Sequence, residues 1–165
     1  MNEARKDTLL QIRNLHVNYV TGEERVLAVN GIDLEMRPGE TLGLVGETGA
    51  GKTTTALAIL GLLPKYTGRV PKGEILFEGQ DLLRASEAQL RKIRGGKISM
   101  IFQDPMTSLN PVMSVGDQIE EVLRNHDSKS TRAELGGKVD SILQLVGIPA
   151  QRKHCLLYTS DAADE

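Results

Sequence analysis

Tryptophan is absent from this 165-residue chain, and Phe and Tyr together supply only 3% of it. Its single cysteine, Cys155, excludes an internal disulfide and a cluster of thiolate ligands for a metal. Acidic and basic groups nearly balance, with 20 Lys and Arg against 22 Asp and Glu, so charge gives no indication of a nucleic-acid partner. We therefore expect a domain that a hydrophobic core stabilises, in a reducing compartment such as the cytoplasm.

Long hydrophobic runs are also missing. The longest apolar stretch, Ala56–Leu63, contains Gly61 and is far shorter than the ~20 residues of a membrane span. Residues Met1–Asp7 lack the apolar centre of a signal peptide. The sequence thus predicts neither a membrane-spanning helix nor a secretion signal.

The last eleven residues, Cys155–Glu165, are unlike the rest of the chain. In frame, they match the translation of a transposon-based sequencing adapter, so we exclude them from reasoning about the fold. Three acids and the cysteine lie in this tail, which leaves residues 1–154 with a net charge of +1 and no cysteine. We expect residues 1–154 to be the natural segment, and the natural protein to continue beyond His154.

The most informative motif is G-x-x-x-x-G-K-T, the pattern of a phosphate-binding loop. Glycines let the backbone curl until successive N–H groups surround phosphate oxygens. The lysine reaches the β- and γ-phosphates of a nucleotide, and the Thr53 hydroxyl is a ligand for Mg²⁺. The predicted loop consists of Gly46, Glu47, Thr48, Gly49, Ala50, Gly51, Lys52 and Thr53.

The segments on either side of the loop support this interpretation. Thr41–Val45 is a short apolar run, typical of a buried parallel strand. Thr53–Leu63 predicts a helix that Pro64 closes. Bound phosphates would then lie at a helix N-terminus, where unpaired amides and the helix dipole favour an anion.

The remaining pattern predicts a mixed α/β fold. Alternating apolar residues over Leu9–Tyr19 and Val26–Met36 indicate antiparallel strands with one solvated face, and Gly73–Leu83 indicates a third such strand followed by a turn. The denser apolar run Ile98–Phe102 predicts a strand of a central parallel sheet, beside the strand of the phosphate loop. Two helices follow, with N-terminal capping patterns at Ser114 with Asp117 and at Thr131 with Glu134, and Gly147 with Pro149 ends the second.

The segment Phe102–Pro111, with the sequence FQDPMTSLNP, identifies the class of phosphate-loop protein. It resembles the Q-loop of ATP-binding-cassette (ABC) ATPases, in the form found in importers of oligopeptides, dipeptides and nickel. The resemblance extends from about Leu9 to His154. It implies a partial P-loop NTPase domain of α/β class, with a central parallel sheet and a small antiparallel β subdomain, incomplete at its C-terminus.

The same resemblance implies roles for particular residues. Gln103 would position Mg²⁺ and the attacking water, which makes it a catalytic and metal-binding residue beside Lys52 and Thr53. Tyr19 aligns with the aromatic residue that stacks on adenine, and Thr54 would contact the α-phosphate. The implied cofactors are therefore ATP and Mg²⁺.

Partners and location also follow from the resemblance. An ABC importer subunit works at the cytoplasmic face of the plasma membrane, against transmembrane permease subunits and a second ATPase subunit, identical or different. An extracytoplasmic solute-binding protein would take part indirectly. The chain shows no signature sequence, Walker B strand or switch histidine, so we expect it to bind nucleotide with little hydrolysis, and we assign ATP hydrolysis to the full-length parent.

Three alternatives stay open from the sequence. Met100–Asp104 also has the form of a Walker B strand, in which Asp104 would hold Mg²⁺ in a different P-loop ATPase. A soluble ABC protein of DNA repair or translation would need no permease. The chain has few aromatic residues and few basic runs, and this scarcity disfavours such a protein. A module that only binds nucleotide is the third.

Overall fold

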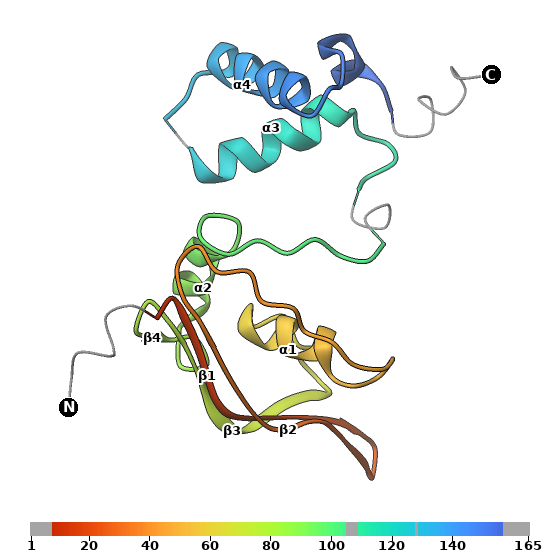
Figure 1. Cartoon of the computed structure of the whole chain (residues 1–165). Helices are drawn as coiled ribbons and strands as arrows, with labels where there is room; N and C mark the ends of the chain where they lie inside the picture. The colour runs from red at the N-terminus through yellow and green to blue at the C-terminus, as the bar shows by residue number, and fades with distance from the viewer. Residues whose placement is uncertain (1–7, 105–108, 128, 157–165) are drawn as a thin grey trace. The chain divides into compact units, whose positions relative to one another are not determined.

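The computed structural model describes residues 8–104, 109–127 and 129–156. The chain divides into two compact units, Met1–Ile98 (unit 1) and Ser99–Glu165 (unit 2). Among the described residues, unit 1 contains the named strands and two helices, whereas unit 2 is helical (Figure 1). The predicted phosphate loop belongs to unit 1, and Gln103 belongs to unit 2.

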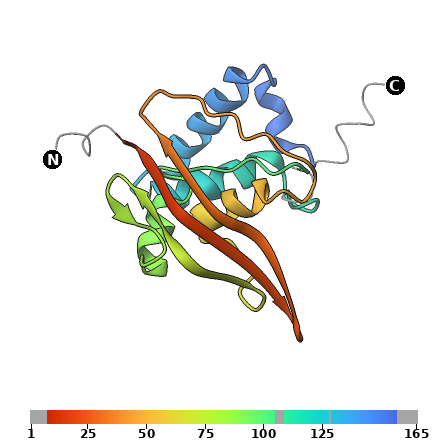
Figure 2. The same cartoon turned by 60° about the horizontal axis from the view of Figure 1, so that its bottom comes forward.

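Unit 1 is built on an antiparallel sheet with the strand order β2-β1-β3-β4. The bounds of these strands are Leu10–Thr21 for β1, Glu24–Met36 for β2, Gly68–Phe77 for β3 and Gln80–Asp81 for β4. β1 and β2 form a long hairpin, which Figure 2 shows most clearly. Its tight turn contains Gly22 at a φ of 62°, a conformation that hairpin turns require and glycine adopts without strain. The three predicted antiparallel strands are confirmed, but β3 begins at Gly68, before the predicted start at Gly73, and ends at Phe77 ahead of the predicted turn.

A bulge in β1 explains why its buried residues change phase. Leu10 and Ile12 are buried before the bulge, and Leu15 and Val17 after it, so the side facing the core shifts from even to odd positions. Side chains alternate strictly along a regular strand, and one extra residue is needed for such a shift. The register with β2 breaks between Ile12 and Leu15, where Asn14 adopts a φ of 44° and its N–H donates to Asp33 Oδ1 at 2.9 Å.

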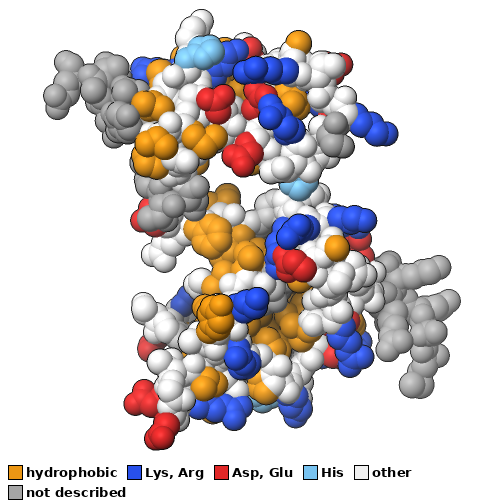
Figure 3. Space-filling view, turned by 180° about the vertical axis from the view of Figure 1, so that it is seen from behind, with side chains coloured by type: hydrophobic (Ala, Val, Ile, Leu, Met, Phe, Trp, Pro, Cys, Tyr) orange, Lys and Arg blue, Asp and Glu red, His pale blue; other side chains and the backbone are white. Residues whose placement is uncertain are grey.

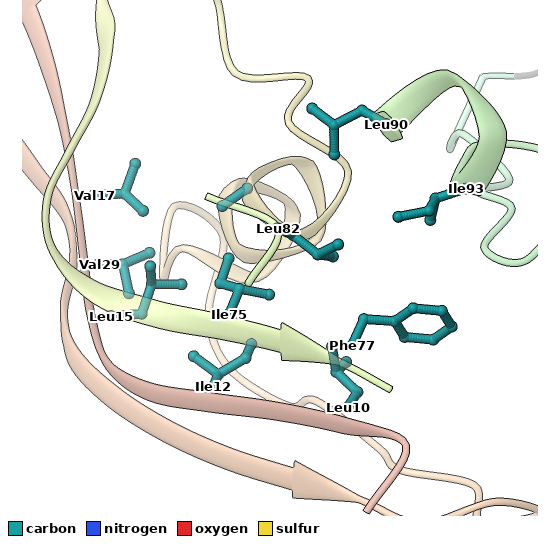
Figure 4. Packing of buried hydrophobic residues seen from close by; sticks show 11 residues of the cluster. Leu10, Ile12, Leu15, Val17, Val29, Ile75, Phe77, Leu82, Leu90 and Ile93 are labelled. Carbon is teal, nitrogen blue, oxygen red and sulfur yellow. The ribbon is translucent and has the colours of Figure 1, made fainter. Parts of the chain in front are cut away.

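The core of unit 1 lies on one face of this sheet. Apolar side chains from β1, β2 and β3 meet residues within α2 and just before it, as Figure 4 shows. The central members are Leu10, Ile12, Leu15, Val17, Val29, Ile75, Phe77, Leu82, Leu90 and Ile93. Helix α1 (Lys52–Ile59) adds the buried residues Thr55 and Ala58 to this interior.

Helix α1 is shorter than the sequence predicts. It ends at Ile59, whereas the sequence indicates an end at Leu63 before Pro64. Gly61 adopts a φ of 61°, its N–H donates to Ala58 O, and the N–H of Leu62 donates to Leu57 O. These paired bonds form a Schellman motif, which closes a helix at a left-handed glycine. The proline therefore lies outside the end of the helix.

The two predicted parallel strands do not form in the described residues. Thr41–Val45 and Ile98–Phe102 lie outside the sheet, and Val45 and Ile101 are 94% and 92% exposed. Parallel strands are stable when both faces are covered and both edges are paired, and this chain supplies only these two candidates for such a sheet. On the face of unit 1 drawn in Figure 3, hydrophobic side chains accordingly reach the surface among Lys and Arg.

Helix α2 (Glu87–Ile93) is absent from the sequence-based prediction. Ser86 caps it, because its side chain accepts from the backbone N–H of Gln89 while the Gln89 side chain accepts from the backbone N–H of Ser86. This reciprocal pair is a capping box, whose sequence signature is Ser or Thr followed three residues later by Glu or Gln. The Ser86–Gln89 spacing is therefore the signal that predicts it.

The described part of unit 2 contains α3 (Val115–His126), α4 (Arg132–Leu145) and a 3₁₀ turn, η2 (Ala150–His154). Both predicted N-terminal caps are confirmed: Ser114 accepts from Asp117 N, and Thr131 forms a capping box with Glu134. At the other end of α4, Gly147 N donates to Gln144 O and Ile148 N to Leu143 O, a second Schellman motif. The predicted end of this helix is thus also confirmed.

The first two residues of the predicted adapter tail contact the start of α3. The N–H of Val115 donates to Cys155 O at 3.1 Å, and Ser114 pairs with Leu156 in an isolated bridge. Both are backbone contacts, so they do not depend on which side chains occupy these positions. The rest of the tail, residues 157–165, lies outside the described residues, and its origin stays a prediction. No helix among the described residues combines the length and apolar character of a membrane crossing.

Candidate nucleotide-binding site

The predicted phosphate loop leads directly into α1. Gly49 and Gly51 adopt φ angles of 86° and 84°, and Ala50 N donates to Glu47 O at 3.1 Å. Two left-handed glycines within three residues curl the backbone tightly, as a concave arrangement of amides requires. Residues 41–50 are all exposed, so a phosphate group can reach this loop.

Gly51 fixes the base of the loop on strand β2. A Cβ built at this position would lie 2.4 Å from Ala28 O and 3.1 Å from Val29 Cγ2. Only glycine therefore fits between the loop and the strand. The antiparallel hairpin thus supports the phosphate loop directly, in a contact that the sequence pattern does not indicate.

The N-terminal end of α1 offers amides to an anion. Its first backbone bond runs from Thr55 N to Gly51 O at 2.8 Å, and the Thr55 hydroxyl donates to the same oxygen at 2.9 Å. Among the described residues no side chain caps this end, and its first turn contains no acid. The first N–H groups of a helix lack partners within it, and the helix dipole makes this end positive. These residue types and this geometry fit a phosphate group.

Lys52 curls back over the loop. Its Nζ donates to Gly46 O and to Glu47 O, each at 2.6 Å. The ammonium group is therefore held by two carbonyls of the loop. A phosphate oxygen there would receive a charge-assisted hydrogen bond from the same Nζ.

The structure brings Tyr19 and Thr54 together. Tyr19 lies near the end of β1, partly buried, and its hydroxyl is 3.4 Å from Thr54 Oγ1 in the first turn of α1. The neighbouring Thr53 is exposed and able to contact a ligand. The ring expected at adenine and the hydroxyl expected at the α-phosphate are thus neighbours, although they are far apart in sequence.

Gln103 is exposed and lies in unit 2 with the rest of the Q-loop segment. Pro105–Ser108 lie outside the described residues. The end of the segment is fixed on α3: Gln118 Oε1 accepts from Asn110 N at 2.8 Å, and Gln118 Nε2 donates to Asn110 O at 3.0 Å. Beside this pair is an apolar cavity of ≈ 500 Å³, lined by residues that include Leu109, Met113, Ile119, Val122 and Ile142.

Comparison with known proteins places the chain among its relatives. The profile of the ABC transporter family matches residues 29–161, which is most of the sequence. The chain belongs to the ABC transporter family. The match begins within β2, includes the phosphate loop and the Q-loop segment, and extends into the predicted adapter tail.

Curated members of the ABC transporter family are similar over most of this chain. It is 48% identical over 143 residues to the dipeptide transport ATP-binding protein DppD of Bacillus subtilis, covering 87% of this chain and 42% of that protein. It is 44% identical over 156 residues to the oligopeptide transport ATP-binding protein OppD of Escherichia coli, covering 94% of this chain and 45% of that protein. The chain thus spans less than half the length of these relatives.

Solved structures agree with the family assignment at the level of the fold. A dimeric post-hydrolysis state of the ATP-binding cassette MJ0796, bound to ADP and Pi, superposes with a TM-score of 0.76 at 21% identity. The similarity covers 90% of this chain and 62% of that one. The expected fold class, a partial α/β ABC ATPase domain, is confirmed. The sheet described here represents its antiparallel part.

Proposed function

We propose that this chain binds ATP through the phosphate loop and Tyr19. The observation that carries the proposal is the convergence of three groups: the uncapped end of α1, the Lys52 ammonium on the loop carbonyls, and the Tyr19–Thr54 contact. Together they supply sites for a triphosphate and an adenine around the first turn of α1.

Each residue has a distinct task in this proposal. The amides from Gly49 to Thr53 surround phosphate oxygens, and Lys52 moves its hydrogen bonds from the loop carbonyls to the β- and γ-phosphates. The Tyr19 ring stacks on adenine, and Thr54 contacts the α-phosphate. Thr53 would be a ligand of Mg²⁺, together with Gln103, and the ion would neutralise charge on the β- and γ-phosphates.

We further propose that the protein serves as the ATP-binding subunit of an importer of peptides or a related solute. The names of the curated relatives, which are dipeptide and oligopeptide transport ATP-binding proteins, support this. In such an importer the subunit would work at the cytoplasmic face of the membrane with permease subunits, a second ATPase subunit and, indirectly, a solute-binding protein. The exposed described residues of the Q-loop segment, such as Gln103 and Asn110, and the apolar cavity beside Asn110 are the surface that we assign to the permease contact.

Titration of the chain with a fluorescent ATP analogue and Mg²⁺ tests nucleotide binding. Lys52→Ala should raise the dissociation constant roughly 10- to 150-fold, because a charge-assisted phosphate contact is worth about 1.5–3 kcal/mol. Lys65→Ala is the matched control: this exposed lysine lies in unit 1 outside the loop and should leave affinity unchanged. Equal affinities of wild type and Lys52→Ala would disprove the proposed site.

Hydrolysis is a separate proposal about the full-length protein. Phosphoryl transfer needs a residue that orients the water, and the sequence contains no Walker B carboxylate or switch histidine in the ABC pattern. We therefore expect ATPase activity at background in this chain, measured as phosphate release. Robust turnover that disappears in Asp104→Asn would instead favour the Walker B interpretation of Met100–Asp104.

A further inference from the structure

The end of α1 opposite the phosphate loop is held by a residue distant in sequence. Arg94 follows α2 directly, and its Nε donates to Leu60 O at 2.7 Å while its Nη2 donates to Gly61 O at 3.0 Å. Its Nη1 forms an ion pair with Glu87 Oε1 at 2.7 Å. Three nitrogens of one guanidinium thus connect the C-terminal end of α1 to the first turn of α2.

Helix α1 does not supply such a contact itself. Its last turn contains no basic residue, and the Schellman bonds of Gly61 and Leu62 occupy the carbonyls of Ala58 and Leu57. Arg94 reaches the carbonyls of Leu60 and Gly61, which these two bonds do not use. A cation at this end also opposes the negative pole of the helix dipole. Because the Arg94 side chain is only 22% exposed, water screens this interaction less than at an open surface.

Arg94 is attached to a rigid support. Leu90 and Ile93 of α2 are buried in the core of unit 1, and the Ser86 capping box fixes the start of the helix. The approach to α1 is close, since a Cβ at Gly61 would lie 3.0 Å from Leu90 Cδ1 and 3.1 Å from Arg94 Nη2. Movement at the C-terminal end of α1 is thereby restricted.

We propose that Arg94 is a positioning residue for phosphate recognition, an inference that rests on the proposed nucleotide site. Helix α1 spans only about 12 Å, so a tilt at its C-terminal end displaces the amides at its N-terminal end. Displacements of about 1 Å can reduce the effect of a positioned group about 100-fold. Arg94 acts at the far end of the helix and touches no part of the nucleotide.

The test compares ATP with AMP, because only ATP engages the whole phosphate loop. Competition against a fluorescent ATP analogue gives both dissociation constants for the 165-residue chain. In Arg94→Met the preference for ATP over AMP should fall about 10-fold, with AMP affinity within about twofold of wild type. Arg94→Lys keeps the positive charge but not the planar guanidinium, so its preference for ATP over AMP should lie between those of Arg94→Met and wild type.

Two control variants separate this role from general stability. Arg91→Met changes an exposed arginine of α2, and Glu87→Gln removes the ion pair but leaves both carbonyl contacts of Arg94. Both should keep the wild-type ratio of ATP to AMP affinity. Hydrogen exchange of the α1 amides should accelerate in Arg94→Met and not in either control.

If Arg94 had a purely structural role, its substitution would reduce the apparent affinities for ATP and AMP by the same factor, in proportion to the folded fraction seen by circular dichroism. That outcome would overturn the inference. If Arg94→Met does not fold, the test rests on Arg94→Lys. A wild-type ratio of ATP to AMP affinity in Arg94→Lys would also overturn the inference. A wild-type chain with no preference for ATP over AMP would instead overturn the proposed nucleotide site, and this inference with it.

Discussion

Gly51 lies against Ala28 so closely that the Ala28 carbonyl oxygen would be 2.4 Å from a Cβ at position 51. Gly49 has nearly the same φ, but a Cβ at position 49 would meet no atom within 4 Å. Gly51→Ala should therefore combine a clash with backbone strain. Gly49→Ala should lower the free energy of unfolding by only about 1–2 kcal/mol, the cost of placing a residue with a side chain in a left-handed conformation. Chemical denaturation followed by circular dichroism should show Gly51→Ala as clearly the less stable variant.

Equal stability of the Gly51 and Gly49 variants would mean that the loop does not rest on β2 as described. Gly22→Ala in the hairpin turn is a further reference, because its φ is also positive and nothing lies within 4 Å. It should behave as Gly49→Ala does.

Replacement of a glycine by alanine should have opposite effects on stability in α3 and in α4. Gly137 lies in α4, exposed and with open space around a Cβ, so Gly137→Ala should stabilise the unit by about 1 kcal/mol through helix propensity. Gly116 in α3 is buried, and a Cβ there would lie 2.9 Å from Lys153 Cβ and from Lys153 O. Gly116→Ala should destabilise it. A loss of stability in Gly137→Ala would contradict the helix described here.

Asp127 makes the stability of unit 2 sensitive to acid. A hydrogen bond from Lys138 and then one from Ser130 lower the pKa of Asp127 from 3.8 to about 2. A lowered pKa means that the ionised form stabilises the fold. This contribution is complete above about pH 4 and is lost as the pH falls through about 2.

The stability difference between wild type and Asp127→Asn should accordingly shrink between about pH 4 and about pH 2, as measured by denaturant titrations at each pH. Lys138→Gln removes the main hydrogen-bond partner of Asp127, so the stability difference between wild type and this variant should shrink over the same pH range. A constant difference across this range would show that the carboxylate makes no specific interaction in solution.

Tyr19 should act through its ring more than through its hydroxyl. The hydroxyl contact with Thr54 is long, at 3.4 Å, so Tyr19→Phe should change ATP affinity less than about threefold. Tyr19→Ala removes the stacking surface and should make the binding free energy of ATP less favourable by about 1 kcal/mol or more. It should leave pyrophosphate competition unchanged, because pyrophosphate has no base. Equal effects of the two variants would exclude stacking.

The sequence predicts the parts of this fold that local patterns determine. Alternation along Leu9–Tyr19 predicts the first strand of the hairpin, and the capping pairs at Ser114 and Thr131 predict the helices of unit 2, because these signals act over a few residues. The run Thr41–Val45 shows the limit of this reasoning. Its composition suits a parallel strand, but a strand needs partners that its own composition cannot supply.

The candidate site divides in the same way. The motif predicts the phosphate loop, and the structure places Tyr19 beside Thr54, two residues that the resemblance assigns to one nucleotide. The supporting contacts of Ala28 and Arg94 have no motif, since they depend on the register of β2 and on the packing of α2 against α1. The role of Gln103 stays a prediction, because it belongs to the other unit.

The pairing of β1 with β3 has a consequence for the order in which unit 1 folds. Hairpin β1–β2 joins neighbouring segments and can form within about 1–10 μs, whereas Tyr19 must find Gly68 across a loop that contains the phosphate motif and α1. Closing that longer loop costs more entropy before any contact compensates it. We therefore expect the support at Ala28 to form before the segment that rests on it is confined, so that the hairpin serves as a template for the nucleotide loop.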